Sequence, residues 1–180
     1  IYSKIFEEKY HDTTFVSIGS CNEIEDIENQ SVKLVSNILK ASKIIKFVDR
    51  DDKSNAEVAE LLTKGIKTLD KRHIENYLLD DEIIKKLCIA QGQEDKIDAC
   101  LIAKQDAIKD SIENRHNPTD DIKSASGKIY TELKRILSLR QCGNNTISFL
   151  RDTMASLITD ETEIYKDLER QIFGTKSTNS

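Results

Sequence analysis

Three acidic residues follow a short apolar segment in the first half of the chain. Phe47-Val48 leads directly into Asp49, with Asp51 and Asp52 close behind. Carboxylates at the end of a strand supply the hard oxygen ligands that Mg²⁺ prefers. On an extended chain Asp49 and Asp51 project from the same face, so both can reach one ion or bridge two. The pattern favours metal-dependent phosphodiester chemistry, with Asp52 as a further ligand or a helix cap; the alternative is an ordinary solvated turn.

Two other segments carry residues that could complete such a site. Arg72 has a guanidinium that fits either a phosphate or the aspartate cluster, or forms a surface ion pair. Glu75 is expected one turn into a helix that starts near Asp70, as a metal or supporting ligand or as a favourable charge at a helix N-terminus. Gly19 and Ser20 fall between a predicted strand and helix, where backbone N–H groups can bind phosphate.

These residues need a sheet to bring them together. Helix and strand patterns alternate through the first half of the chain, which predicts a parallel sheet with right-handed crossovers. Ligands gather outside the carboxyl edge of such a sheet. The predicted strands are 14–18, 44–48 and 66–69; the predicted helices have core faces at Tyr2, Ile5, Phe6 and Tyr10, at Ile24, Ile27, Leu34, Val35 and Ile38, and at Val58, Leu61 and Leu62 after an Asn55 cap and before a Lys64-Gly65 stop.

From about residue 82 the strand signals end and helical spacing takes over. The expected fold class is therefore α/β, a small parallel sheet flanked by helices, followed by an α-helical subdomain. We expect domains at 1–85 and 86–173, with a polar tail at 174–180. The helical faces are Ile83, Ile84, Leu87 and Cys88; Ile97, Leu101, Ile108 and Ile112, together with Ala103 and Ala107; Ile122, Ile129, Leu133, Ile136 and Leu137; Ile147, Leu150, Met154 and Leu157; and Ile164, Leu168 and Ile172.

Composition narrows the class of protein. The 180 residues include one proline and six glycines, too few turn formers for an all-β fold, and no apolar run approaches the length of a membrane span. The net charge is −5, and neither half is basic: residues 1–90 hold 14 basic and 17 acidic side chains, residues 91–180 hold 13 and 15. This argues against a stand-alone nucleic-acid binder. Four scattered cysteines predict buried, reduced thiols and a cytoplasmic location.

Three segments together resemble a known family. The stretches 15–24 (FVSIGSCNEI), 47–52 (FVDRDD) and 72–79 (RHIENYLL) are similar to the Toprim-like nuclease domain that accompanies ABC-type ATPases. Such domains occur in overcoming-lysogenization-defect nucleases and related bacterial anti-phage systems. The resemblance covers roughly residues 1–85 and implies Mg²⁺-dependent (or Mn²⁺-dependent) cleavage of nucleic acid, with an ABC-type ATPase domain or subunit as partner.

The resemblance assigns roles to particular residues. Asp49 and Asp51 correspond to the metal-binding Asp-x-Asp, Glu75 to the acidic member of the third segment, and Gly19-Ser20 to the glycine turn. Toprim domains also carry a glutamate on a strand before the first helix, whereas this chain begins at Ile1 inside what resembles that helix. We therefore expect a piece of a longer protein, with little activity on its own.

Two other functions remain open at this stage. The same fold could be a non-catalytic docking or regulatory domain of an ABC-type ATPase, with its helical half contacting the ATPase or a second copy. A phosphotransferase in which Asp49 becomes phosphorylated is the third alternative, although the Lys and Ser/Thr that it needs on neighbouring strand ends are not evident.

Overall fold

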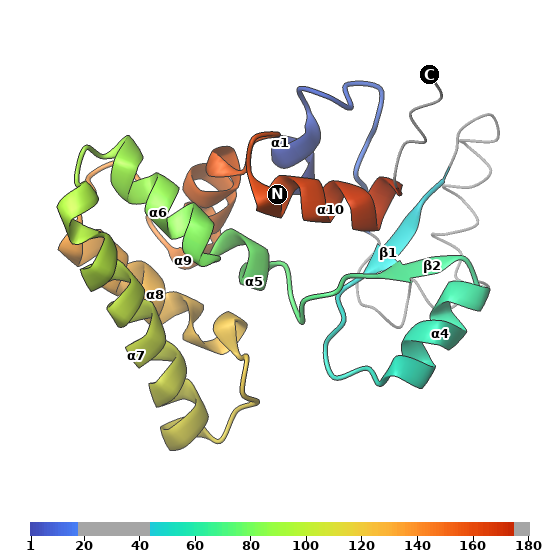
Figure 1. Ribbon diagram of the computed structural model, residues 1–180, viewed down its shortest axis with the longest axis horizontal. Coiled ribbons are helices and arrows are strands. Elements are labelled where there is room, and N and C mark those ends of the chain that lie inside the picture. Colours follow the sequence, from blue (N-terminus) through green and yellow to red (C-terminus); the bar gives the residue numbers. More distant parts are fainter. Residues whose placement is uncertain (18–43, 175–180) are drawn as a thin grey trace. The chain divides into compact units, whose positions relative to one another are not determined.

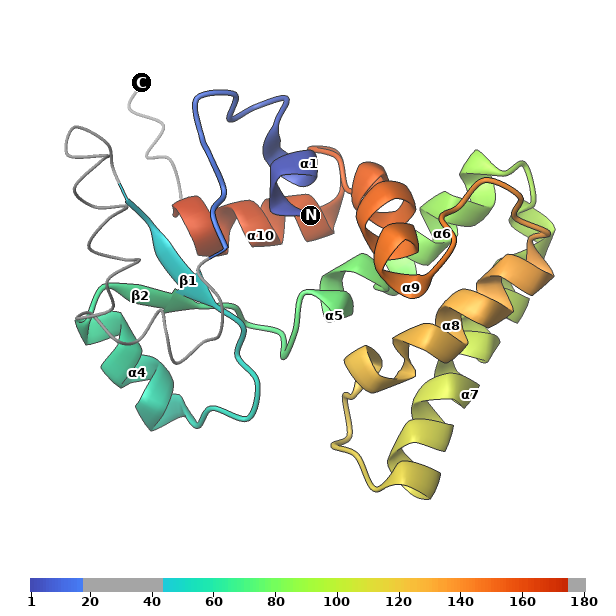
Figure 2. The ribbon, with the colours of Figure 1, turned by 180° about the vertical axis from the view of Figure 1, so that it is seen from behind.

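The computed structural model describes residues 1–17 and 44–174, which fall into two compact units (Figures 1 and 2). The first unit contains residues 1–13 and 73–166, and the second contains 14–72 and 167–180. The chain is mixed α/β and mostly helical. The division differs from the boundary expected between residues 85 and 86, because the chain leaves the second unit at residue 72 and re-enters it near its C-terminal end.

The second unit is built around a parallel pair of strands. β1 (Lys46–Val48) and β2 (Ile66–Thr68) pair in register, with Val48 opposite Thr68, and α4 (Asn55–Thr63) connects them. The predicted parallel arrangement is confirmed for this pair, which is the sheet in the described part of the chain. Figure 1 shows α4 beside β2, and the buried contact between helix and sheet consists of Val48, Leu61 and Ile66.

The ends of α4 are fixed by local side chains. Ser54, not Asn55, is the N-cap: its hydroxyl accepts the Glu57 N–H at 3.3 Å, and the Glu57 carboxylate accepts the Ser54 N–H at 2.8 Å. Gly65, with φ of +72°, ends the helix as predicted. The predicted core face is only partly right, because Leu62 is 64% exposed while Leu61 is buried.

The last turns of α10 (Glu163–Phe173) complete the second unit. The Lys67 ammonium donates to the Ile172 carbonyl at 2.7 Å, and the Asp70 N–H donates to the Gln171 side chain at 2.7 Å. A lysine at the carboxyl end of a helix satisfies a carbonyl that has no partner within the helix, and it complements the helix dipole. β2 is thus attached to a helix about a hundred residues away in the sequence.

The strand expected at residues 14–18 is not formed in its described part. Residues 14–17 lie outside any helix or strand. Phe15 contributes through its side chain instead: its ring packs edge-on against Phe47 and Phe173, with centroids 6.4 and 6.3 Å apart. Ring packing therefore places this segment in the unit, without backbone pairing. The helix predicted at 24–38 lies outside the described residues.

The first unit is helical, as predicted for most of its length. α7 and α8 pack along each other (Figure 2), and α6 contacts α7. Its elements are α1 (Tyr2–Phe6), α5 (Glu75–Leu78), α6 (Asp81–Ala90), a 3₁₀ turn (Glu94–Lys96), α7 (Ile97–Arg115), α8 (Ile122–Ile136), α9 (Thr146–Ser148), a π-helical segment (Phe149–Met154), a 3₁₀ turn (Ala155–Leu157) and the start of α10.

The buried face of α7 differs from the prediction. The buried residues are Cys100, Lys104, Ala107 and Ser111, of which Ala107 was expected, whereas the expected isoleucines, Leu101 and Ala103 are half-buried. Small side chains on the inner face allow a close approach to α8. Lys104 is accommodated because its ammonium donates to Asp81 at 2.6 Å.

The segment after α8 also departs from the prediction. One helix through Ile147, Leu150, Met154 and Leu157 was expected, but the chain forms a short α-helical turn, a π-helical segment and a 3₁₀ turn. Leu150 and Met154 are buried, yet Ile147 is 73% exposed. The change of helix type rotates successive side chains out of a single 3.6-residue face.

The N-terminus of α10 is capped from α6. The Glu82 carboxylate accepts the N–H groups of Glu163 and Ile164 at 3.0 and 3.1 Å. Those amides have no partner within the helix, and a negative charge is favourable there. The predicted core face Ile164, Leu168 and Ile172 is confirmed as buried.

The described cysteines behave as predicted. Cys88, Cys100 and Cys142 are buried and form no disulfide. Burial raises the pKa of the Cys88 thiol and raises the pKa of Cys100 to about 12, so both stay protonated at neutral pH. In the same described ranges, no helix has the length and apolar character needed to cross a membrane.

The Ser54–Glu57 capping box should contribute measurable stability. We expect Ser54→Ala to lower the free energy of unfolding at pH 7 by about 1 kcal/mol. Hydrogen bonds from the Ser54 hydroxyl and N–H lower the pKa of Glu57. Glu57 therefore adds stability above its ordinary pKa, and loses it as the pH falls through the lowered value.

The measurement is urea unfolding of both proteins between pH 3 and 7. The difference between them should narrow toward pH 3. Ser126→Ala, which removes a hydroxyl inside α8 instead of a cap, is the control. An effect of Ser54→Ala no larger than that of Ser126→Ala would contradict the capping role.

Candidate metal centre at the acidic loop

The acidic loop, residues 49–54, leaves β1 beside the segment that leaves β2. The Leu69 N–H donates to the Val48 carbonyl at 3.0 Å, and the Asp51 N–H donates to the Arg72 carbonyl at 2.9 Å. Both bonds lie at the carboxyl end of the strand pair, where parallel sheets usually bind ligands. Two of the three loops predicted to converge, those that follow β1 and β2, therefore adjoin each other in the second unit, while the third, at Gly19 and Ser20, lies outside the described residues.

Asp51 adopts a conformation that the sequence did not indicate. Its φ is +48°, in the left-handed region, and it lies in a turn with Asp52. The expected alternation of Asp49 and Asp51 along an extended chain is therefore wrong at Asp51. Aspartate tolerates this region better than most residues, and such conformations concentrate at functional sites.

Lys53 lies within the loop as an internal cation. Its ammonium is 3.3 Å from the Asp49 carbonyl oxygen and 3.3 Å from a carboxylate oxygen of Asp51. The Lys53 side chain is only 14% exposed, against 39% for Asp51. A partly buried ion pair of this kind offsets the repulsion among neighbouring carboxylates.

Arg72 binds the other end of the aspartate run. Its guanidinium lies 2.9 Å from the Asp52 carboxylate, and the Arg72 side chain is 12% exposed while Asp52 is 78% exposed. Arg50 donates to the Asn55 side chain at 2.6 Å. Asp52 is therefore a partner of Arg72, not the cap of α4.

The segment between β2 and α5 is not helical, which corrects the expected place of Glu75. α5 begins at Glu75 itself, not near Asp70. The backbone groups of residues 70–72 are bonded elsewhere, because Asp70 N–H donates to Gln171 and the Arg72 carbonyl accepts from Asp51. Asp70 also pairs with Arg170 at 3.2 Å.

Glu75 belongs to the first unit, whereas Asp49, Asp51, Asp52 and Arg72 belong to the second. One carboxylate oxygen of Glu75, Oε2, is buried and accepts no hydrogen bond within the described part of the chain. The predicted phosphate-binding turn at Gly19 and Ser20 lies outside the described residues.

Sequence reasoning missed several residues at these places. Thr68 ends β2 opposite Val48, and its hydroxyl oxygen is buried without a hydrogen-bond partner among the described residues. Asn76 is buried, accepts the His73 N–H at 3.1 Å and donates to the Asp120 carbonyl. Strand alternation could have indicated Thr68, since it shares the face of buried Ile66. No local signal marks the contact of Asn76 with residue 120.

The donor set can be tested against Mg²⁺. No group of three or more His, Cys, Asp or Glu side chains close enough to hold a metal occurs in residues 1–17 and 44–174. Mg²⁺ is commonly bound by one or two carboxylates, with water and substrate phosphates completing the octahedron. Asp49 and Asp51 are the two carboxylates expected for that smaller set, and the Lys53 ammonium, 3.3 Å from an Asp51 carboxylate oxygen, is a competing cation.

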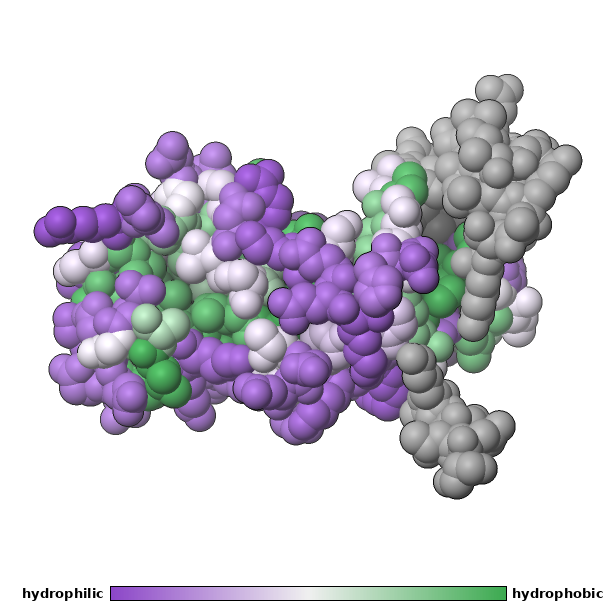
Figure 3. Space-filling model, turned by 90° about the horizontal axis from the view of Figure 1, so that it is seen from above, coloured by the Kyte–Doolittle hydropathy of each residue, from purple (hydrophilic) through white to green (hydrophobic). Residues whose placement is uncertain are grey.

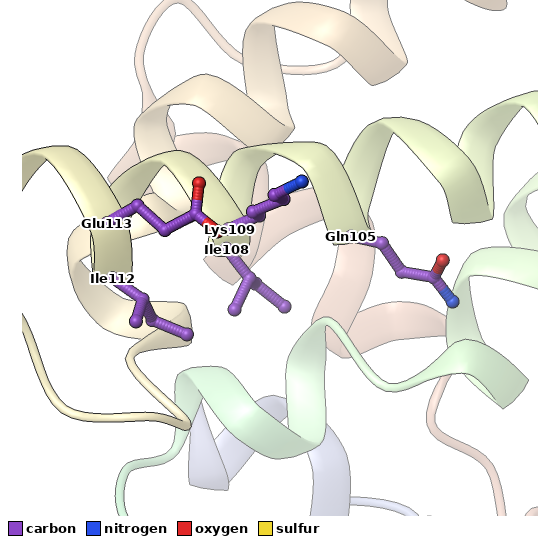
Figure 4. A pocket seen from close by; sticks show the side chains of 5 residues that line it. All are labelled: Gln105, Ile108, Lys109, Ile112 and Glu113. Carbon is purple, nitrogen blue, oxygen red and sulfur yellow. The ribbon is translucent and has the colours of Figure 1, made fainter.

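One surface depression lies away from the acidic loop in the sequence. A shallow depression of about 260 Å³ lies on α7, lined by Gln105, Ile108, Lys109, Ile112 and Glu113 (Figure 4). It is mostly apolar and is remote in sequence from the acidic loop. The face seen in Figure 3 carries small green hydrophobic areas interrupted by purple hydrophilic side chains.

Comparison with known proteins adds no assignment. The chain matches no protein-family model, and no match was found among curated proteins or among solved structures.

The buried hydroxyl of Thr68 gives a stability prediction. A buried hydroxyl without a partner costs about 1–3 kcal/mol, and valine has nearly the same shape without that group. We therefore expect Thr68→Val to raise the free energy of unfolding by about 1 kcal/mol in urea titrations. Thr63→Val is the control, because that hydroxyl donates to the Glu60 carbonyl. A lower free energy of unfolding in Thr68→Val would show that the Thr68 hydroxyl has a hydrogen-bond partner.

The position of Lys53 gives a second prediction. Replacing its ammonium with an apolar group removes the competing cation beside Asp51, so Lys53→Met should bind Mg²⁺ more tightly, by about tenfold for one charge at this separation. Titration calorimetry measures the change. Lys64→Met is the control, because Lys64 pairs with Glu60 on α4. Equal affinities in both variants would rule out competition by Lys53.

Proposed function

We propose that this chain is a Toprim-like, Mg²⁺-dependent nuclease module of an ATPase-linked bacterial defence or DNA-repair protein, acting in the cytoplasm. The observation that carries the proposal is the hydrogen bond from Asp51 to Arg72, which holds the acidic loop against the segment leaving a parallel neighbouring strand. A parallel β–α–β unit with acidic residues at its carboxyl edge is what the resemblance implies.

Each residue has a role in this proposal. Asp49 and Asp51 bind Mg²⁺ or Mn²⁺ together with water and phosphate oxygens. A bound ion supplies Lewis-acid stabilisation of the charge that develops on a phosphodiester. Arg72 holds the loop through Asp52 and its own carbonyl, so it positions the ligands.

Two further roles rest on the resemblance. Glu75 is the acidic member of the third motif, and its unbonded buried oxygen is consistent with a partner supplied on binding. Gly19 and Ser20 form the glycine-containing turn. An ABC-type ATPase domain or subunit is the proposed protein partner.

A docking or regulatory domain of such an ATPase is the second candidate. The observation that favours it is the internal neutralisation of the acidic loop, where Lys53 lies beside Asp51 and Arg72 beside Asp52. A loop whose charges are balanced by its own neighbours does not require a metal for its conformation.

Metal binding separates the two candidates. We expect the chain to bind Mn²⁺ in titration calorimetry, and Asp49→Asn/Asp51→Asn to weaken binding by at least about tenfold, because both charged ligands are lost. Asp98→Asn/Asp106→Asn removes the same charge from the exposed surface of α7 and serves as the control. Equal affinities in the two double variants would contradict the metal site and favour the docking module.

A further inference from the structure

A basic stretch is present within this acidic chain. Residues 122–150 hold five basic side chains and one acidic side chain, although the chain has a net charge of −5. The stretch covers α8, the loop after it and α9. The net charge of residues 91–180 does not reveal this stretch, because acidic residues elsewhere in that half outnumber the basic ones.

The exposed side of α8 gathers this charge on one face. At 100° per residue, its basic residues fall within an arc of about 140°, opposite the buried Ile129 and Leu133. Glu132 lies at the edge of the arc, paired with Arg135 at 2.7 Å. We call this surface the basic face; it consists of Lys123, Lys128, Lys134 and Arg135.

The partners of these cations leave them accessible. Lys128 pairs with Asp110 on α7 at 3.3 Å, in an exposed pair that contributes little energy. Lys134 lies over the Tyr130 ring, 5.6 Å from its centroid. Lys123 has no ion pair in the part of the chain that the structure describes, and neither does Arg140 in the following loop.

The residues between the cations are small and polar. Ser124, Gly127 and Thr131 occupy the same arc of α8, so a flat or convex partner can approach the helix closely. Gly127 also faces α9, since a Cβ there would lie 3.7 Å from the Thr146 hydroxyl. The Ser124 hydroxyl lies in this arc, and hydroxyl groups beside Lys and Arg are typical of surfaces that contact a phosphate backbone.

The chemistry favours a duplex over a single strand. Proteins that bind single strands stack bases on exposed aromatic rings. The aromatic residue of α8, Tyr130, is buried, and the loop at 137–146 contains no aromatic residue. The charges extend along a straight helix for about 17 Å from Lys123 to Lys134, a span that several phosphates of a duplex can follow.

We infer that the basic face, extended by Arg140, is a binding surface for the phosphate backbone of duplex DNA. The choice of DNA as partner rests on the proposed nuclease function, whereas the charge and shape of the surface do not depend on it. Its contacts would be independent of base sequence, because they reach phosphates and not base edges.

The test is binding of a fluorescein-labelled 30-base-pair duplex by the whole chain, measured by anisotropy in EDTA. We expect Lys123→Gln/Arg140→Gln to weaken binding about tenfold at 50 mM salt, and to reduce the slope of log affinity against log salt by about 2. Lys85→Gln/Lys109→Gln removes the same charge at exposed positions on α6 and α7, and should change both quantities much less.

EDTA removes divalent metal ions, so the result does not depend on metal binding at Asp49 and Asp51. If the unchanged chain binds the duplex but does not bind Mn²⁺ in a separate titration, the nuclease proposal fails and the binding surface stands. Three results would contradict the inference. They are absence of duplex binding, equal losses of affinity in Lys123→Gln/Arg140→Gln and in the control Lys85→Gln/Lys109→Gln, and tighter binding of a single strand or of anionic vesicles than of the duplex.

Discussion

The hydrogen bond between the Asp51 N–H and the Arg72 carbonyl joins the two loops that leave the parallel strands. Among the described residues of this unit, the strand pairing is three residues long on each side, so it fixes little beyond the strands themselves. The bond between the loops extends that order to the acidic residues. It also accounts for the left-handed conformation of Asp51, which presents its N–H to a carbonyl twenty-one residues later.

Electrostatics then decides what the loop can do. Three aspartates within four positions repel one another, and cations close to them reduce that repulsion. Lys53 lies beside Asp51 and Arg72 beside Asp52, and both cationic side chains are little exposed. In the proposed nuclease, a divalent ion at Asp49 and Asp51 would reduce the same repulsion.

Local patterns predicted β1, α4 and β2, because the apolar strand segments and the glycine that ends α4 are recognisable from neighbouring residues. The buried face of α10 was predicted in the same way, from its helical spacing. The sequence could not reveal features that depend on distant partners. α5 starts at Glu75 because Gln171 and Asp51 bind the backbone before it. α7 is buried through Cys100, Ala107 and Ser111 because close packing on α8 favours small residues over isoleucine. The basic face can be recognised only when the charged residues of α8 are placed around the helix by its periodicity, because a count of charges alone does not show that they share one side.

The attachment of β2 to α10 has a consequence for how the chain folds. Lys67 meets Ile172 across 105 residues, and Asp70 meets Gln171 across 101. The sheet unit therefore closes a very long loop, and its contact order is high although its strands are short. During synthesis, β1, α4 and β2 leave the ribosome well before the helix that completes their unit. The intervening segment, residues 73–166, can fold in that interval, so β2 gains its contacts with α10 only after that segment has been made.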